Sequence, residues 1–210
     1  FSRVIWGSRF SLSIGILAVV IGTTVGMFFG SLAGYFGGLV DDIIMRLVDI
    51  LSSIPDILLA IAVSVVLGPG FFNSVLALCI GSIPMSVRLL RAAILSIRQQ
   101  EYLEAATSIN AGTARIIVRH VLPNSFSPVL VSSTMMIGHV ILAAAMLSFI
   151  GLGVQPPMPE WGSMIAGGRS LIRTAPHMVT FPGIFIMLAV LALNMFGDGL
   201  RDALDPKLKK

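Results

Sequence analysis

The sequence predicts an all-α fold, in which a bundle of helices crosses a membrane several times. Composition is the first observation behind this prediction, since 56% of the 210 residues are hydrophobic and only 11% are charged. An ordinary soluble domain carries about 25% charged residues. The second observation is that long runs contain no Asp, Glu, Lys or Arg, at residues 10–40, 57–87, 120–159 and 174–197. A helix needs about 20 apolar residues to cross a bilayer, so spanning helices fill these runs.

We expect one transmembrane domain over residues 10–200, with five spans at about residues 10–35, 43–67, 73–97, 125–150 and 178–197. Residues 1–9 form a tail before the first span. Because the chain begins with Phe1 and not with Met, we expect this tail to continue a longer protein with at least one more helix.

The first two spans each carry an irregular feature. A glycine recurs every four residues along the first span, at Gly22, Gly26, Gly30 and Gly34. Such a series lets another helix approach closely, and we expect it to serve packing and not to line a path. The second span is broken at Pro55, whose ring removes a helical hydrogen bond. The carboxylate of Asp56 follows, and we favour a capping role over the alternative that it lines an aqueous path.

The third span, which we expect to kink near Pro84, leads into the longest polar interval, residues 101–124. This interval predicts two short helices with a turn at Ala111-Gly112, the second one stopped by Pro123. Each helix has a short apolar stripe, formed by Tyr102, Ala105, Ala106 and Ile109 and then by Ile116, Ile117, His120 and Val121. The pair could lie in the lipid interface. We favour docking into a groove of another protein, because the first helix lacks Lys and Arg.

The fourth span carries His139, and an unusual loop follows that span. A histidine inside a membrane is a functional hypothesis, although we favour an interhelical hydrogen bond. In the loop at residues 153–177, Pro and Gly fix turns, and Trp161 suits an interfacial anchor. We expect a compact cap on the helix ends. The alternative is contact with an outer partner, through Gln155, Trp161 and Gly162.

The distribution of Lys and Arg predicts the orientation of the chain. With residues 98–122 in the cytoplasm, ten of the 14 Lys and Arg residues fall inside, and four fall outside, at Arg3, Arg9, Arg169 and Arg173. This excess agrees with the positive-inside rule. The loop at 153–177 and the tail at 1–9 then lie outside, and the basic tail at 201–210 lies in the cytoplasm.

The motifs of common enzyme classes are missing from the sequence. It has no GxxxxGK[ST] phosphate loop, no HExxH and no CxxC. Cys79 is the single cysteine, which excludes an internal disulfide. We therefore expect no catalytic site, cofactor or metal in this chain.

The polar interval resembles the EAA motif of ABC importer permeases. Glu104-Ala105-Ala106 and then Leu122-Pro123 match it, whereas Asn110 stands where the family has Gly and His120 where it has Ile. Asn tolerates the left-handed backbone better than most residues, and Gly112 lies close by. Other blocks resemble the dipeptide/oligopeptide branch of the family and cover essentially the whole chain: Gly7 to Arg9, Tyr35 to Gly38, Met45 to Asp49, Leu147 to Pro157, Trp161-Gly162 and Gly197 to Pro206.

The resemblance implies a type I ABC importer permease fold in a bacterial or archaeal inner membrane. Its partners would be a second homologous permease, two ABC ATPases that bind and hydrolyse ATP with Mg, and an external substrate-binding protein. Residues 101–122, called the coupling segment from here on, would dock in a groove of an ATPase. The residues that would make this contact are Glu104, Ala105, Ala106, Asn110, Gly112, Arg115, Arg119, Leu122 and the adjacent Pro123.

Transport of di- and oligopeptides is the function that the resemblance implies. Related permeases carry nickel complexes, glutathione or oligosaccharides, and these stay open as alternatives. The rival class is a channel or an ion-coupled carrier, which needs charges inside the membrane. Asp56 is the only good candidate for such a charge.

Overall fold

The computed structural model of the chain describes residues 1–97 and 116–204. Every element in these ranges is helical, which confirms the predicted all-α class. The elements are α1 (Ser2–Phe36), α2 (Gly38–Ser52), α3 (Asp56–Leu67), α4 (Phe71–Ile97), the π-helix η1 (Ile117–Val121), α7 (Leu122–Phe149), α8 (Trp161–Gly168), the 3₁₀ helix η2 (Arg169–Leu171) and α9 (His177–Leu204).

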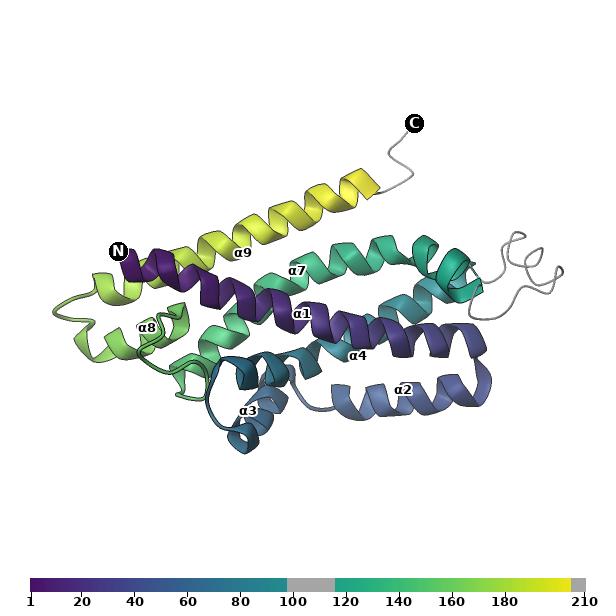
Figure 1. Ribbon diagram of the computed structural model, residues 1–210, viewed down its shortest axis with the longest axis horizontal. Coiled ribbons are helices and arrows are strands. Elements are labelled where there is room, and N and C mark those ends of the chain that lie inside the picture. The colour runs from purple at the N-terminus through teal and green to yellow at the C-terminus, as the bar shows by residue number, and fades with distance from the viewer. Residues whose placement is uncertain (98–115, 205–210) are drawn as a thin grey trace.

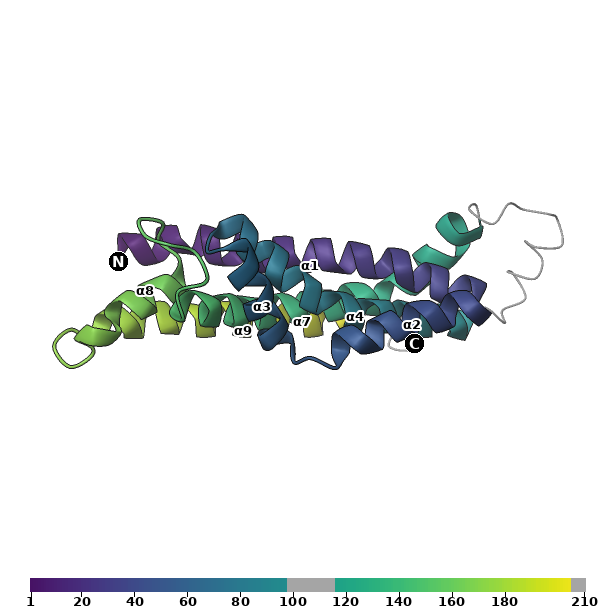
Figure 2. The same ribbon diagram turned by 90° about the horizontal axis from the view of Figure 1, so that it is seen from below.

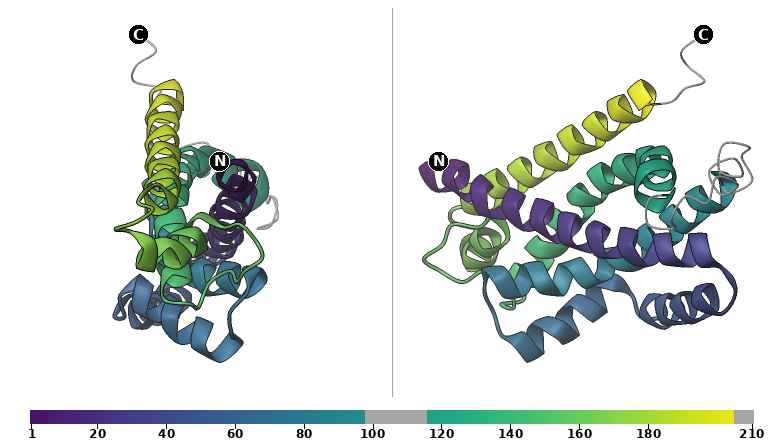
Figure 3. Two further views of the ribbon diagram at one scale, coloured as in Figure 1. Left: turned by 90° about the vertical axis from the view of Figure 1, so that its left-hand side faces the viewer. Right: turned by 45° about the vertical axis from the view of Figure 1, so that its right-hand side comes forward.

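Four long helices, α1, α4, α7 and α9, run along the length of the molecule (Figure 1). Each is long and apolar enough to cross a membrane, and the bent pair of α2 and α3 would make a fifth span. The start of α1 and helix α8 lie at one end, called the α8 end, whereas α2 lies toward the opposite end, called the α2 end (Figures 1 and 2). Helix α9 packs on α7 and α8 and diverges from α1 toward its C-terminus (Figure 3).

Helix α1 packs most extensively on α4, through its glycine series. A Cβ atom at Gly22 would lie 1.8 Å from Ser82 Oγ, and one at Gly26 would lie 2.4 Å from Ser86 Cβ. Only glycine leaves room for a neighbouring helix at such a distance. The packing role expected for this series is therefore confirmed.

The main core is built where α1 meets three other helices. Its buried residues are Ile14, Ala18 and Val19 of α1, Ala60 of α3, Val75, Leu78 and Cys79 of α4, Val140, Ala144 and Leu147 of α7, and Val154. A hydrogen bond between the hydroxyls of Thr23 and Ser133, 3.1 Å apart, joins α1 to α7 as well. These contacts make α1, α4 and α7 the rigid centre of the fold.

The expected second span consists of two helices that meet at an angle of 84°. Helix α2 already starts at Gly38, because Gly37 and Gly38 have φ angles of 65° and 53° and reverse the chain directly after α1. It ends before Ile54, since a residue preceding proline avoids the helical region. Helix α3 then begins after Pro55.

Other helix ends extend beyond the ranges expected from the sequence. Helix α1 starts at Ser2 and α9 continues to Leu204, where spans of 10–35 and 178–197 were expected. Charged residues such as Arg9 and Asp198 end an apolar run but do not end a helix. Helix α4 continues through Pro84 to Ile97. The loop at 153–177 contains α8 and η2.

Candidate coupling and translocation sites

Most contact residues of the coupling segment lie outside the described residues. This applies to Glu104, Ala105, Ala106, Asn110, Gly112 and Arg115, and to the side chain of Leu122. Arg119 and Pro123 are described, and both are exposed to solvent.

The expected stop of the helix at Pro123 is wrong. The π-helix η1 continues directly into α7, with Pro123 in the first turn of α7. The first turn of an α-helix leaves its N–H groups without helical partners, so a proline fits there without loss. The chain therefore stays helical from η1 into α7, although the type of helix changes at Leu122.

The C-terminal part of the coupling segment packs into a buried cluster at the α2 end. We call this cluster the anchor; it consists of Leu90, Ile94, Ile116, Val121 and Val129. Ile116 and Val121 are only 2% and 1% exposed. Leu90 and Ile94 belong to α4 and Val129 belongs to α7, so the anchor joins these two helices where the coupling segment returns to the bundle.

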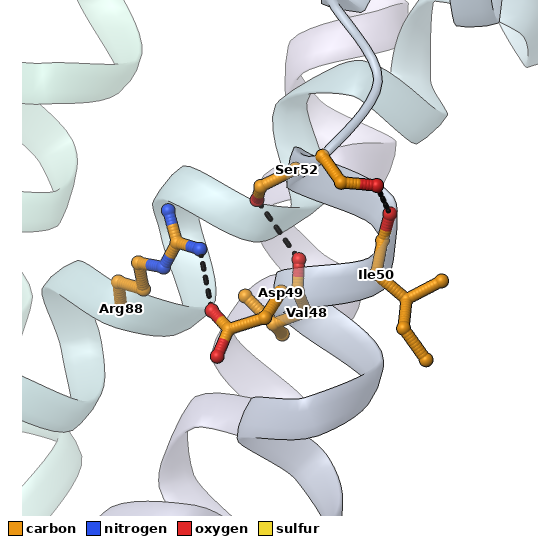
Figure 4. A network of polar contacts seen from close by, with 6 residues as sticks. Val48, Asp49, Ile50, Ser52 and Arg88 are labelled. Atoms are coloured by element: carbon orange, nitrogen blue, oxygen red, sulfur yellow. Dashed lines mark hydrogen bonds and ion pairs between the residues drawn. The ribbon is translucent and has the colours of Figure 1, made fainter.

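Two ion pairs tie α2 to α4. Arg88 Nη2 lies 2.7 Å from Asp49 Oδ1, with both side chains largely exposed (Figure 4). Arg91 binds both carboxylate oxygens of Asp41, and this pair is half-buried. The partner of Asp49 is therefore on a neighbouring helix, although Arg46 lies three residues before it on the same helix.

A cavity of about 560 Å³ lies between α3, α4 and α7. Its lining consists of Asp56, Ile57 and Ala60 of α3, Leu78, Gly81, Ser82 and Met85 of α4, and Met136, His139, Val140, Leu142, Ala143 and Met146 of α7. Asp56 and His139 are its ionisable lining residues. Among the described residues, no group of three His, Cys, Asp or Glu side chains could hold a metal ion.

The structure corrects the favoured interpretations of Asp56 and His139. Pro55 occupies the N-cap position of α3, and Asp56 makes no capping hydrogen bond. Its carboxylate instead lies on the cavity wall. The hydrogen bonds of the described residues include none from His139, which is exposed and lines the same cavity.

The loop at 153–177 forms a compact cap at the α8 end, as the sequence analysis favoured. Trp161 is only 2% exposed, and its indole N–H donates to the carbonyl of Val4 at 2.9 Å. An interfacial anchor is therefore the wrong interpretation of Trp161, because the cap folds back over α1. A Cβ atom at Gly162 would lie 2.5 Å from Ala145 Cα. Gln155 remains exposed.

A buried carboxylate that the sequence analysis missed holds this cap. Glu160 is 1% exposed and is the N-cap of α8. It accepts the backbone N–H groups of Gly162 and Ser163, both at 2.8 Å, and the hydroxyl of Ser11 at 3.2 Å. Glu is not among the preferred N-cap residues, so local sequence preference does not point to this role.

Comparison with known proteins agrees with this architecture. The sequence profile of the family described as "Binding-protein-dependent transport system inner membrane component" matches residues 26–210. A glutathione transport system permease protein of Pectobacterium atrosepticum is 51% identical over all of this chain. A dipeptide transport system permease protein of Alkalihalophilus pseudofirmus is 47% identical over all of it, and a di/tripeptide transport system permease protein of Pseudomonas aeruginosa is 49% identical over 99%. The chain covers 69% of each relative.

Solved structures share the fold at low sequence identity. A chain from inward-facing conformations of the MetNI methionine ABC transporter has a TM-score of 0.78 at 18% identity, over 98% of this chain and 97% of that one. A chain from an amino acid ABC transporter has a TM-score of 0.67 at 18% identity, over 99% and 94%. The type I permease fold expected from the sequence is thus confirmed. The chain belongs to the family of binding-protein-dependent transport system inner membrane components, as a permease subunit of an ABC importer.

Proposed function

We propose that this permease forms, with a second homologous permease, the path for di- and oligopeptides that an external binding protein delivers. Three relatives of 47–51% identity support this substrate class, because they are described as glutathione, dipeptide and di/tripeptide permeases. Glutathione is itself a tripeptide, so one class of small peptides covers all three. The chain has no catalytic role in this proposal, and partner ATPases bind and hydrolyse ATP with Mg.

The observation that carries the proposal is that the same two helices flank the coupling segment and line the cavity. Helix α4 ends at Ile97 and α7 begins at Leu122. Both helices supply cavity walls farther along, at Gly81 and at His139 for example. The anchor joins them at their shared end. Because packed interiors transmit displacement and do not absorb it, motion of the coupling segment reaches the cavity.

In this mechanism the two ATPases close on ATP and push on the coupling segments of the two permeases. Each permease rocks as a rigid body, and the path between the two permeases, onto which the cavity of each would open, faces outward to receive the peptide. Hydrolysis and product release turn the cavity inward again, which is alternating access. Glu104, Ala105 and Ala106 are the proposed ATPase contacts, and the exposed Arg119 would flank them.

The proposed orientation places the α2 end in the cytoplasm. Helices that reach this end carry Arg46, Arg88, Arg91, Arg119 and Arg201, whereas Arg3, Arg9, Arg169 and Arg173 belong to elements of the α8 end. The α8 end then faces the binding protein. Gln155 is the exposed contact there, and the buried Trp161 and Gly162 hold the shape of the cap.

Uptake into vesicles tests the function. The complete importer, assembled with the second permease, both ATPases and the binding protein, is placed in lipid vesicles that contain ATP, and uptake of a labelled dipeptide is measured. We expect uptake that stops when ATP, the binding protein or this permease is omitted. Uptake driven by an ion gradient without ATP would contradict the proposal and favour an ion-coupled carrier instead.

A further inference from the structure

We propose that Asp56 binds the positively charged amino group of the transported peptide inside the cavity between α3, α4 and α7. This inference rests on the proposed function and deepens it. It assigns the recognition of one chemical group, shared by every peptide with a free amino terminus, to one side chain of this chain.

The carboxylate of Asp56 is placed for a ligand and not for a partner within the fold. Neither of the ion pairs among the described residues includes it, and no described hydrogen bond satisfies its oxygens. None of the described lining residues is Lys or Arg. Asp56 is exposed to the cavity, and an ionisable residue within a membrane protein usually pairs with an opposite charge, so the cavity favours a cation.

Helix α4 makes room for this carboxylate. A Cβ atom at Gly81 would lie 3.4 Å from Asp56 Cβ and 3.8 Å from its Cγ. The side chain of Asp56 therefore lies beside α4 at Gly81, at a distance that even an added methyl group would meet as an ordinary van der Waals contact. Asp56 itself is exposed and lines the cavity directly after the break between α2 and α3.

The rest of the lining suits a peptide of variable sequence. Met85, Met136 and Met146 supply unbranched, polarisable side chains that adapt to different shapes. His139 offers a donor or an acceptor to the peptide backbone from α7. A volume of about 560 Å³ lies within the usual range for small-molecule sites. The apolar walls also strengthen the attraction between Asp56 and an ammonium group.

Stabilisation of the α3 dipole is the purely structural alternative, since an acidic residue in the first turn of a helix is favourable. Such a role needs no cation in the cavity. The two roles therefore differ in a measurable property, which is the charge preference of the cavity itself.

Thiol labelling measures that preference without any transport. In the assembled importer, a Met85→Cys variant is treated with methanethiosulfonate reagents that carry either a trimethylammonium or a sulfonate group. The rate at which each reagent modifies position 85 is divided by the rate at which the same reagent modifies a free thiol in solution, which removes the difference in intrinsic reactivity. The wild-type chain gives the background, because its single cysteine, Cys79, is buried. Intact mass identifies labelling of this chain.

We expect the cationic reagent to be favoured about fivefold or more, because Asp56 lines the same cavity as position 85 and its charge attracts the ammonium reagent and repels the sulfonate. Adding Asp56→Asn should remove the preference, whereas adding Asp42→Asn, an exposed acid of α2, should keep it. An unchanged preference in the Asp56→Asn background overturns the proposal. So does a lack of labelling at position 85, which would mean that the assembled cavity is closed to ligands.

Dipeptide uptake by the reconstituted importer is the second test of the proposal. At limiting substrate we expect Asp56→Asn to slow uptake about tenfold or more, the value of one charged hydrogen bond, whereas Asp56→Glu and Asp42→Asn retain most of it. Equal uptake by Asp56→Asn and wild type overturns the inference alone. Absence of ATP-dependent uptake by the wild type contradicts the proposed function, while the labelling result still decides whether the cavity selects cations.

Discussion

Glu160 connects segments of the chain that lie far apart in sequence. Its carboxylate receives two backbone N–H groups at the start of α8 and the hydroxyl of Ser11 in α1. The same hydroxyl accepts the backbone N–H of Trp161 at 3.1 Å. Because hydrogen bonds to a buried charge are among the strongest in proteins, this small network fixes the cap on α1.

Glu160→Gln should destabilise the protein by about 2 kcal/mol, because the amide keeps one acceptor oxygen and turns a donor toward a backbone N–H. Denaturation of the purified importer, followed by fluorescence, measures the effect. Asp198→Asn on the exposed face of α9 is the matched control and should change stability by less than about 0.5 kcal/mol. Equal stability of the two variants would show that the network does not hold the cap.

Residues of the cap also show the limit of local sequence patterns. Trp is a residue type typical of interfacial anchors, yet Trp161 is buried. Its indole and backbone N–H groups bind Val4 and Ser11, which lie about 150 positions earlier in the chain. Asp56 is a second such residue, because the sequence offered both a capping role and a place on an aqueous path. The sequence favoured a cap, because the cavity wall depends on α4 and α7, which local preference does not describe.

At the scale of helices, the glycine series of α1 sets how closely α4 can approach. Gly26→Ala should destabilise the protein by about 1–2 kcal/mol, because the new Cβ atom would overlap Ser86 and crowd the α4 backbone. Gly199→Ala in α9 is the control, since nothing lies within 4 Å of the added atom. It should have the opposite sign and stabilise by up to about 1 kcal/mol, because Ala favours a helix over Gly.

The same denaturation assay measures both alanine variants. A stabilising effect of Gly26→Ala would contradict the close approach of α1 and α4. A greater loss of stability in Gly199→Ala than in Gly26→Ala would lead to the same conclusion.

Long uncharged runs predicted the four long helices, because an apolar segment of that length has few alternatives in a membrane. The 84° bend between α2 and α3 could not be predicted. Pro55 indicates a break but carries no information about its angle. Contacts of α3 with α4, and the ion pairs of Asp41 and Asp49 with α4, position the two halves.

For the whole molecule, the two ends have separate tasks in the proposed importer. The α2 end holds the anchor, and the α8 end holds the cap. The cavity lies between α3, α4 and α7. Since α1, α4 and α7 share one core, the proposed function requires that displacement at one end moves the cavity walls with it. The family resemblance predicted this division, whereas the anchor and the cavity lining required the three-dimensional fold.

Membrane topology can be tested with single cysteines. Gln155→Cys in the cap should react with an impermeant maleimide added outside intact cells, and Arg201→Cys near the end of α9 should react only after the cells are opened. Both positions are exposed, and the native Cys79 is buried. The reverse pattern would contradict the orientation derived from the positive-inside rule.

In the proposed importer, the coupling segment receives force from an ATPase subunit. A photoreactive benzophenone amino acid in place of Ala106, in the assembled importer, tests this contact most directly, with the same residue in place of the exposed Ala203 as the control. We predict that irradiation joins position 106 to the ATPase in high yield and that position 203 gives much less of this product. Adducts of position 106 with lipid alone, or with no protein, would contradict the account.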